Sequence, residues 1–223
     1  MRNPIPALSL LETRVLGTLA EKQRTVPDSY PLTLNALVSG CNQKTSRDPV
    51  MEATEAEVQA TIDSLRRYSL VVESSGGRVA RYEHNLERGL QVSPESAALL
   101  TALFLRGPQT AGELRIGCER LYHFADISAA EGVLKELAAR PAGVLVVEMP
   151  RLTGARENRW AHLLSGAPAP EAPVATTKSV GDVSLSEVAA LKANVARLEA
   201  EVIALRAQVT RICTELGIPD SRA

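Results

Sequence analysis

The sequence has few residues of the kinds that carry redox, metal or base-stacking chemistry. Its 223 residues include three cysteines, three histidines, one tryptophan, four tyrosines and two phenylalanines. Cys41, Cys118 and Cys213 are too far apart for a CxxC metal motif or a disulfide framework, and the histidines are isolated from one another. We therefore predict no metal and no cofactor, and the few aromatic residues argue against a base-stacking surface. This cysteine usage fits a reducing, cytoplasmic location.

Long apolar runs and an excess of one charge are also missing. No apolar stretch approaches the roughly 18 residues of a membrane-spanning helix. Glu12 and Arg14 interrupt the region where a signal peptide needs an apolar run. Lys and Arg total 25 and Asp and Glu total 26, so no overall field attracts nucleic acid or an anionic membrane. We expect no membrane partner.

Sequence motifs of enzymes are absent as well. Neither GxxxxGK[ST] nor GxGxxG occurs, so no nucleotide site is indicated. Cys41 could act as a nucleophile with His84 as its base, but no nucleophile elbow accompanies it. Because Cys41 follows a run of apolar residues, we favour a buried packing role for it. We predict no catalytic residues and no enzymatic activity.

The first part of the chain has the element order of a winged helix. Capping boxes at residues 9–12 and 54–57 open two helices, and a short helix is predicted between them at residues 32–41. The segment 70–84 then changes period and predicts two strands joined at Gly76-Gly77. Three helices followed by a hairpin are typical of a winged helix.

The same order of elements is predicted a second time. An apolar helix at 93–106 precedes capping boxes at 110–113 and 128–131, and two strands follow in VLVVEMP and NRWAHLL. Gly-Cys recurs at 40–41 and 117–118, and Val-Val-Glu recurs with nearly the same offset. These matches indicate an internal duplication.

The C-terminal part combines a linker with a heptad pattern. Residues 166–184 are rich in Pro and Ala, a composition typical of an extended tether. The segment 185–217 then places valine at most a positions and leucine at most d positions, which favours a parallel two-stranded coiled coil. An amphipathic helix packed on its own domain is the alternative. The predicted seam residues are Val188, Leu191, Val195, Leu198, Val202, Leu205, Val209, Ile212 and Leu216.

Several motifs resemble one known family. LETRVLGTLAEKQ, TVPDSYPL, CNQKTSRDPVM and GELR together resemble the YceH-like family of uncharacterised bacterial tandem winged-helix proteins. The resemblance implies the architecture and leaves the function open. We therefore predict a mainly α chain with small β-hairpin wings (α+β): two tandem winged-helix domains and a C-terminal coiled-coil helix. The predicted parts are domain 1 (1–91), domain 2 (92–165), the linker (166–184) and the coiled coil (185–217).

Function is predicted from the surfaces that a winged helix uses. Both predicted third helices carry acidic side chains, which disfavour deep insertion into the major groove. Phosphate contacts would then come from the two hairpins and from the loop at 42–53, whose polar side chains could alternatively bond the loop's own backbone. The predicted nucleic-acid-binding residues are Lys44, Arg47, Arg78, Arg81, Arg151, Arg156 and Arg159. We predict a dimeric, DNA-associated regulatory module; the alternative is a protein-interaction scaffold without nucleic-acid contact.

Overall fold

The computed structural model describes residues 7–74, 79–151 and 154–168, together with Val202. The chain divides into two units, Met1–Glu171 and Ala172–Ala223, and the description below concerns the first. Most of the predicted linker, and every seam residue except Val202, lie outside the described residues. The coiled coil and the dimer therefore stay predictions.

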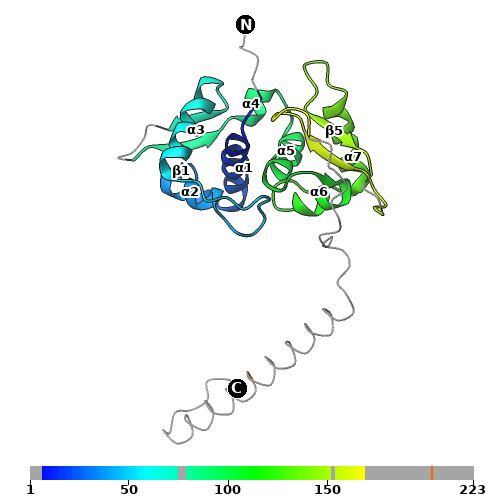
Figure 1. Cartoon of the computed structure of the whole chain (residues 1–223), viewed down its shortest axis with the longest axis horizontal. Coiled ribbons are helices and arrows are strands. Elements are labelled where there is room, and N and C mark those ends of the chain that lie inside the picture. Colours follow the sequence, from blue (N-terminus) through cyan, green and yellow to red (C-terminus); the bar gives the residue numbers. More distant parts are fainter. Residues whose placement is uncertain (1–6, 75–78, 152–153, 169–201, 203–223) are drawn as a thin grey trace, which may run out of the picture. The chain divides into compact units, whose positions relative to one another are not determined.

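The first half of this unit packs a small antiparallel sheet against helices (Figure 1). The strand order is β1-β3-β2, and the β2–β3 hairpin closes at the pair Ser74 and Arg81. α3 buries Val58, Ile62 and Leu65, whose spacing puts them on one helix face. The elements are α1 (Leu10–Thr25), a 3-10 helix (Pro27–Ser29), β1 (Leu32–Thr33), α2 (Leu34–Cys41), α3 (Glu55–Arg67), β2 (Val71–Ser74) and β3 (Arg81–His84).

The second half has the same order of helices and strands, after a short connecting helix. Its sheet order is β4-β6-β5, which corresponds strand for strand to the first sheet. The elements are α4 (Leu86–Leu90), α5 (Pro94–Arg106), β4 (Gln109–Thr110), α6 (Ala111–Gly117), α7 (Ile127–Ala138), β5 (Val146–Met149) and β6 (Arg159–His162). The described part is thus a mixed α/β structure with two small antiparallel sheets.

Equivalent residues occupy equivalent places in the two halves. Cys41 lies at the end of α2 and Cys118 follows α6, and both thiols are buried. His84 ends β3 opposite Val71, as His162 ends β6 opposite Val146. The repeated order predicted from short sequence matches is therefore present in the structure, while the predicted domain boundary at residues 91 and 92 stays a prediction.

α1 and α5 lie side by side between the two sheets and join the halves (Figure 1). Residues 13–20 of α1 and 96–105 of α5 are buried without interruption, so these segments are covered on all sides. One hydrophobic core includes residues of both halves. At Gly17 the helices approach so closely that a Cβ would lie 2.9 Å from Leu105 Cδ2 and 3.1 Å from Phe104 Cβ.

Three of the four predicted capping boxes are confirmed. At 9–12, 54–57 and 110–113 the N-cap hydroxyl and the glutamate three residues later each accept a hydrogen bond from the other's backbone N–H. The box predicted at 128–131 is wrong. α7 is capped by Asp126, whose carboxylate accepts a 2.7 Å hydrogen bond from the backbone N–H of Ala129. An aspartate caps a helix without a reciprocal glutamate, so α7 begins earlier than the box pattern indicates.

Two further differences from the predicted elements concern short segments. Leu32 and Thr33 form β1 rather than the start of a helix, because they pair with Tyr82 and Arg81 of β3. Thr33 then caps α2. The sequence patterns do not predict α4, a five-residue helix. Within the described residues, we find no helix with the length and apolar character needed to span a bilayer.

Substitutions at two helical glycines test the α1–α5 contact. Gly17→Ala should lower the free energy of unfolding by about 1 kcal/mol, because overpacking against Leu105 and Phe104 outweighs the gain in helix propensity. Gly17→Val should lower it further. The control is Gly132→Ala in α7, where no atom lies within 4 Å of the added Cβ and a gain of about 0.5–1 kcal/mol is expected. Urea unfolding measures all three; a Gly17→Ala chain as stable as the wild type would contradict the close contact.

Candidate functional site

Arg47, one of the predicted phosphate contacts, lies in the loop that joins α2 to α3 and is buried. Its side chain is 0% exposed, and its guanidinium bonds both carboxylate oxygens of Glu21 at 3.1 and 2.6 Å. Arg47 also donates to the Gly40 carbonyl and to Gln43 Oε1. Because the side chain is buried and its guanidinium is engaged, the structure gives no support to the assignment of Arg47 to nucleic-acid binding, which stays a prediction.

Arg14 in α1 is a second buried arginine beside Arg47. Its guanidinium donates to the Cys41 carbonyl at 3.1 Å and to the Pro49 carbonyl at 2.7 Å. Burial, and then the positive charge of Arg47, lower the pKa of Arg14. Arg14 thus ties the end of α2 and the interior of the loop to the first helix.

The 42–53 loop is held by its own amide and by the second half of the chain. The Asn42 side chain exchanges two 2.8 Å hydrogen bonds with the backbone of Ala53. The backbone N–H of Asp48 donates to the carbonyl of Leu105 in α5 at 2.8 Å. This supports the interpretation that the loop's polar side chains stabilise its backbone. Lys44 remains exposed.

Cys41 and His84 do not form a nucleophile and base pair. Cys41 is fully buried beside Thr18, and burial raises the pKa of its thiol. His84 Nε2 lies 2.8 Å from Gln23 Oε1, and its Nδ1 accepts from the backbone of Leu86. Burial, and then Arg24, lower the pKa of His84 to about 4. The packing role predicted for Cys41 is confirmed, and both nitrogens of His84 are already engaged.

The remaining predicted cations of the first half differ in availability. Arg81 is exposed at the start of β3, but its guanidinium donates to the Pro31 carbonyl at 2.8 Å. Arg78 lies outside the described residues. In α3, Arg66 pairs with Glu73 of β2 at 2.7 Å, so part of the positive charge at the end of that helix is neutralised. The acidic start of α3 is confirmed, with Glu55 and Glu57 in its first turn.

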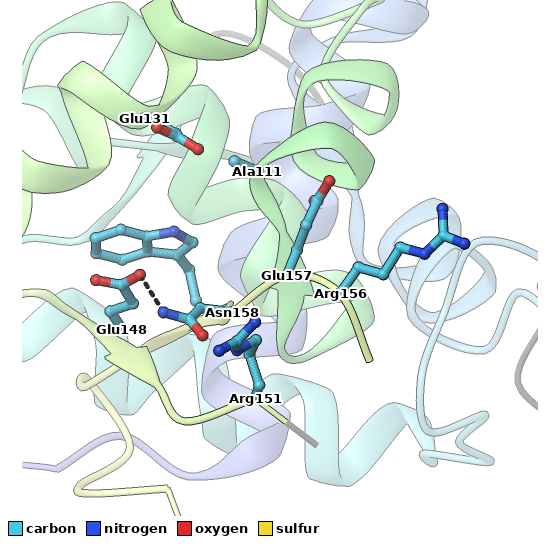
Figure 2. Close-up of a pocket in the computed structure, with 8 residues that line it drawn as sticks. Ala111, Glu131, Glu148, Arg151, Arg156, Glu157 and Asn158 are labelled. Atoms are coloured by element: carbon cyan, nitrogen blue, oxygen red, sulfur yellow. Dashed lines mark hydrogen bonds between the residues drawn. The ribbon is translucent and has the colours of Figure 1, made fainter. Parts of the chain in front are cut away.

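The second half has an open pocket of about 330 Å³ between its hairpin and its helices (Figure 2). The pocket lies on the side of the second half that α6, α7 and the β5–β6 hairpin form. Two of the predicted arginines, Arg151 and Arg156, line it. Its lining is mostly charged: Ala111, Glu131, Glu148, Arg151, Arg156, Glu157, Asn158 and Trp160.

The side chains that line this pocket carry charges of both signs. Glu148 accepts a 2.7 Å hydrogen bond from Asn158, and Glu131 lies 3.7 Å from Lys135 on α7. In Figure 2, the Arg156 side chain extends away from Glu131 and Glu148. Arg159 is half-buried in β6, where it pairs with Thr110 and Met149. In the described part of the chain, no group of three or more His, Cys, Asp or Glu side chains is placed to hold a metal ion.

Sequence patterns did not identify Arg14 as a structural residue, nor Glu21 as the partner of Arg47. Neither contact has a local signal, because the partners are far apart in the sequence. In the folded chain, burial alone would raise the pKa of Glu21, but hydrogen bonds and attraction from Arg47 outweigh it and lower the pKa. This pair therefore stabilises the folded state above the pKa of an unfolded glutamate, and its contribution declines as the pH falls through the lowered pKa.

Two substitutions in the 42–53 loop separate its buried cation from its exposed one. Arg47→Met should lower the free energy of unfolding by about 3 kcal/mol at pH 7, because it removes the buried guanidinium that pairs with both carboxylate oxygens of Glu21. Lys44→Met should change it by less than about 0.5 kcal/mol. The difference between Arg47→Met and the wild type should shrink as the pH falls through the lowered pKa of Glu21. Equal effects of the two substitutions in urea unfolding would contradict the buried pair.

Comparison with known proteins supplies the family. Residues 8–155 match a family model described as "Protein of unknown function, DUF480". A UPF0502 protein of Dechloromonas aromatica is 60% identical over 202 residues, which cover 90% of this chain and 93% of the relative. UPF0502 proteins of Methylibium petroleiphilum and Paraburkholderia phytofirmans are each 56% identical and cover 97% of this chain; 93% and 92% of their own lengths match. The prediction of an uncharacterised bacterial family is confirmed, and the chain belongs to the DUF480 family, also called UPF0502.

Proposed function

We propose that this chain is a non-enzymatic, dimeric module of two winged-helix domains that binds protein partners. The winged-helix assignment is supported by the helix–strand–helix–helix–hairpin order and by the matching strand orders of the two sheets. The observation that carries the function is the charge of the surfaces with which a winged helix meets DNA, its third helix and its hairpin.

Those surfaces have no cationic excess among the described residues. In the first half, the acidic side chains outnumber the basic ones. They are Glu55, Glu57, Asp63, Glu73 and Glu83 against Arg66, Arg67 and Arg81. In the second half they balance, with Glu131, Glu136, Glu148 and Glu157 against Lys135, Arg151, Arg156 and Arg159. A protein gains much of its affinity for a DNA duplex by neutralising phosphates with Lys and Arg. Surfaces without a cationic excess therefore favour protein partners over DNA.

The burial of Cys41, the best candidate for a nucleophile, supports the proposal that the chain is not an enzyme. The Cys41 thiol is enclosed in the core, and its raised pKa keeps it protonated at neutral pH. Burial likewise raises the pKa of Cys118 to about 12.

DNA association is the second candidate, and one observation favours it. Arg151 and Arg156 are exposed on the hairpin of the second half, where a winged helix contacts phosphates. Such contacts would be independent of sequence, because they neutralise the backbone without reading bases.

Duplex binding separates the two candidates. The proposed function predicts that the full chain, titrated to about 100 μM at roughly 50 mM salt, shows no saturable binding to mixed-sequence duplex in fluorescence anisotropy. If DNA were the partner, affinity would fall with a log–log slope of about −0.9 per phosphate contact, and Arg151→Ala/Arg156→Ala would flatten that slope.

A pull-down with the tagged full chain tests the protein partner directly. The proteins retained should be the same before and after nuclease treatment. Loss of all retained proteins on nuclease treatment, together with salt-dependent duplex binding, would contradict the proposed function and support the DNA candidate.

Light scattering tests the dimer. The full chain should have twice its sequence mass, because the seam at 188–216 pairs two copies. A chain ending near Val180 should be a monomer. A monomeric full chain, or a truncated chain that dimerises equally well, would exclude dimerisation through this seam.

A further inference from the structure

An exposed apolar strip runs along α6 and the start of α7 in the second half. Ile116 is 70% exposed and Ile127 is 44% exposed. A Cβ added at Gly112 would lie 3.7 Å from Ile127 Cδ1, so the Ile127 side chain reaches over Gly112. Ile116 lies one helical turn after Gly112 and on the same face of α6. Gly112, Ile116 and Ile127, called the apolar strip below, are therefore contiguous.

The first half has polar residues at the equivalent places. Thr33 caps α2 as Thr110 caps α6, which aligns Asn35 with Gly112 and Ser39 with Ile116. The first residue of α3 is Glu55, whereas the first residue of α7 is Ile127.

The two repeats thus build the same surface, and it is apolar in one of them alone. The fold therefore does not require apolar residues here. Because exposed apolar side chains gain nothing from the core, we attribute this difference to contact with another molecule.

The strip borders a carboxylate of the charged pocket. Glu157 Oε2 would lie 3.9 Å from a Cβ at Gly112, and Glu157 shares the pocket with Glu131 and Glu148 (Figure 2). Arg156 extends away from Glu131 and Glu148. Arg151 also lines the pocket, so the negative charge that borders the strip is that of Glu157, and a ligand that covers Ile116 and Ile127 meets this carboxylate beside the apolar contact.

We propose that the apolar strip and the adjoining Glu157 carboxylate bind a protein segment that has a bulky apolar side chain close to a lysine or arginine. The apolar side chain covers Ile116 and Ile127, and the cation reaches the Glu157 carboxylate. This inference rests on the proposed function and names the partner's chemistry. Nucleic acid fits less well, because its phosphates would approach the Glu157 carboxylate that borders the strip.

A displayed library of random 12-residue peptides, selected on the full chain, tests the proposal. Enriched peptides should carry Leu, Ile, Met or Phe within about four positions of Lys or Arg. A synthetic copy of one enriched peptide is then titrated by fluorescence anisotropy. Replacing its Lys or Arg with Glu should weaken binding at least tenfold.

Two substitutions in the second half introduce the residue types found at the equivalent positions of the first half. Ile116→Ser and Ile127→Glu, which introduce the residues found at positions 39 and 55, should each weaken peptide binding at least tenfold. The midpoint of urea unfolding should be unchanged, because both side chains are exposed and Glu suits the first turn of a helix. The matched control is Asn35→Ala/Ser39→Ala in the first repeat, which should bind the peptide like the wild type.

The outcomes separate this inference from the proposed function. No enriched peptide family, an acidic consensus, or equal binding by the two isoleucine variants and the wild type would overturn the inference. If the Ile116→Ser/Ile127→Glu chain still retains, after nuclease treatment, the same proteins as the wild type, the proposed function stands and the assignment of binding to this surface is wrong. If the wild-type chain retains no protein, the proposed function itself fails.

Discussion

The contact between α1 and α5 is the interaction on which the rest of the structure depends. Residues 13–20 of α1 and 96–105 of α5 are buried, and Gly17 lets α1 approach Leu105 and Phe104. Each half thereby contributes buried side chains of one helix to a common hydrophobic core. The 42–53 loop reinforces this contact, because the backbone of Asp48 donates to the Leu105 carbonyl at the end of α5. A disturbance of either helix should therefore affect both halves.

A common core has a consequence for the proposed function. Two surfaces built on the same elements, α2 with α3 and α6 with α7, are carried by one folded unit. Their side chains have diverged: the first surface is polar and acidic, and the second carries the apolar strip beside a charged pocket. A module with two unlike faces on one core is suited to holding protein partners in a defined relation.

Local signals predicted most of the elements but few of the contacts between them. Reciprocal caps at Ser9, Thr54 and Thr110 mark helix starts because their bonds span three residues. Arg47 was predicted on the surface, since a charged residue in a polar loop normally lies there; its burial depends on Glu21, 26 positions earlier. The exposure of Ile116 could not be predicted either. α6 has only seven residues, so the spacing of its apolar residues does not tell which of them face the core and which face solvent.

Native-state hydrogen exchange of the full chain at increasing denaturant tests the common core most directly. Buried amides of α1, α3, α5 and α7 should converge on one free energy of opening, because neither half retains its core once α1 and α5 separate. Convergence of the α1 and α3 amides on one value and of the α5 and α7 amides on a clearly different one would show that the halves unfold independently and would contradict this account.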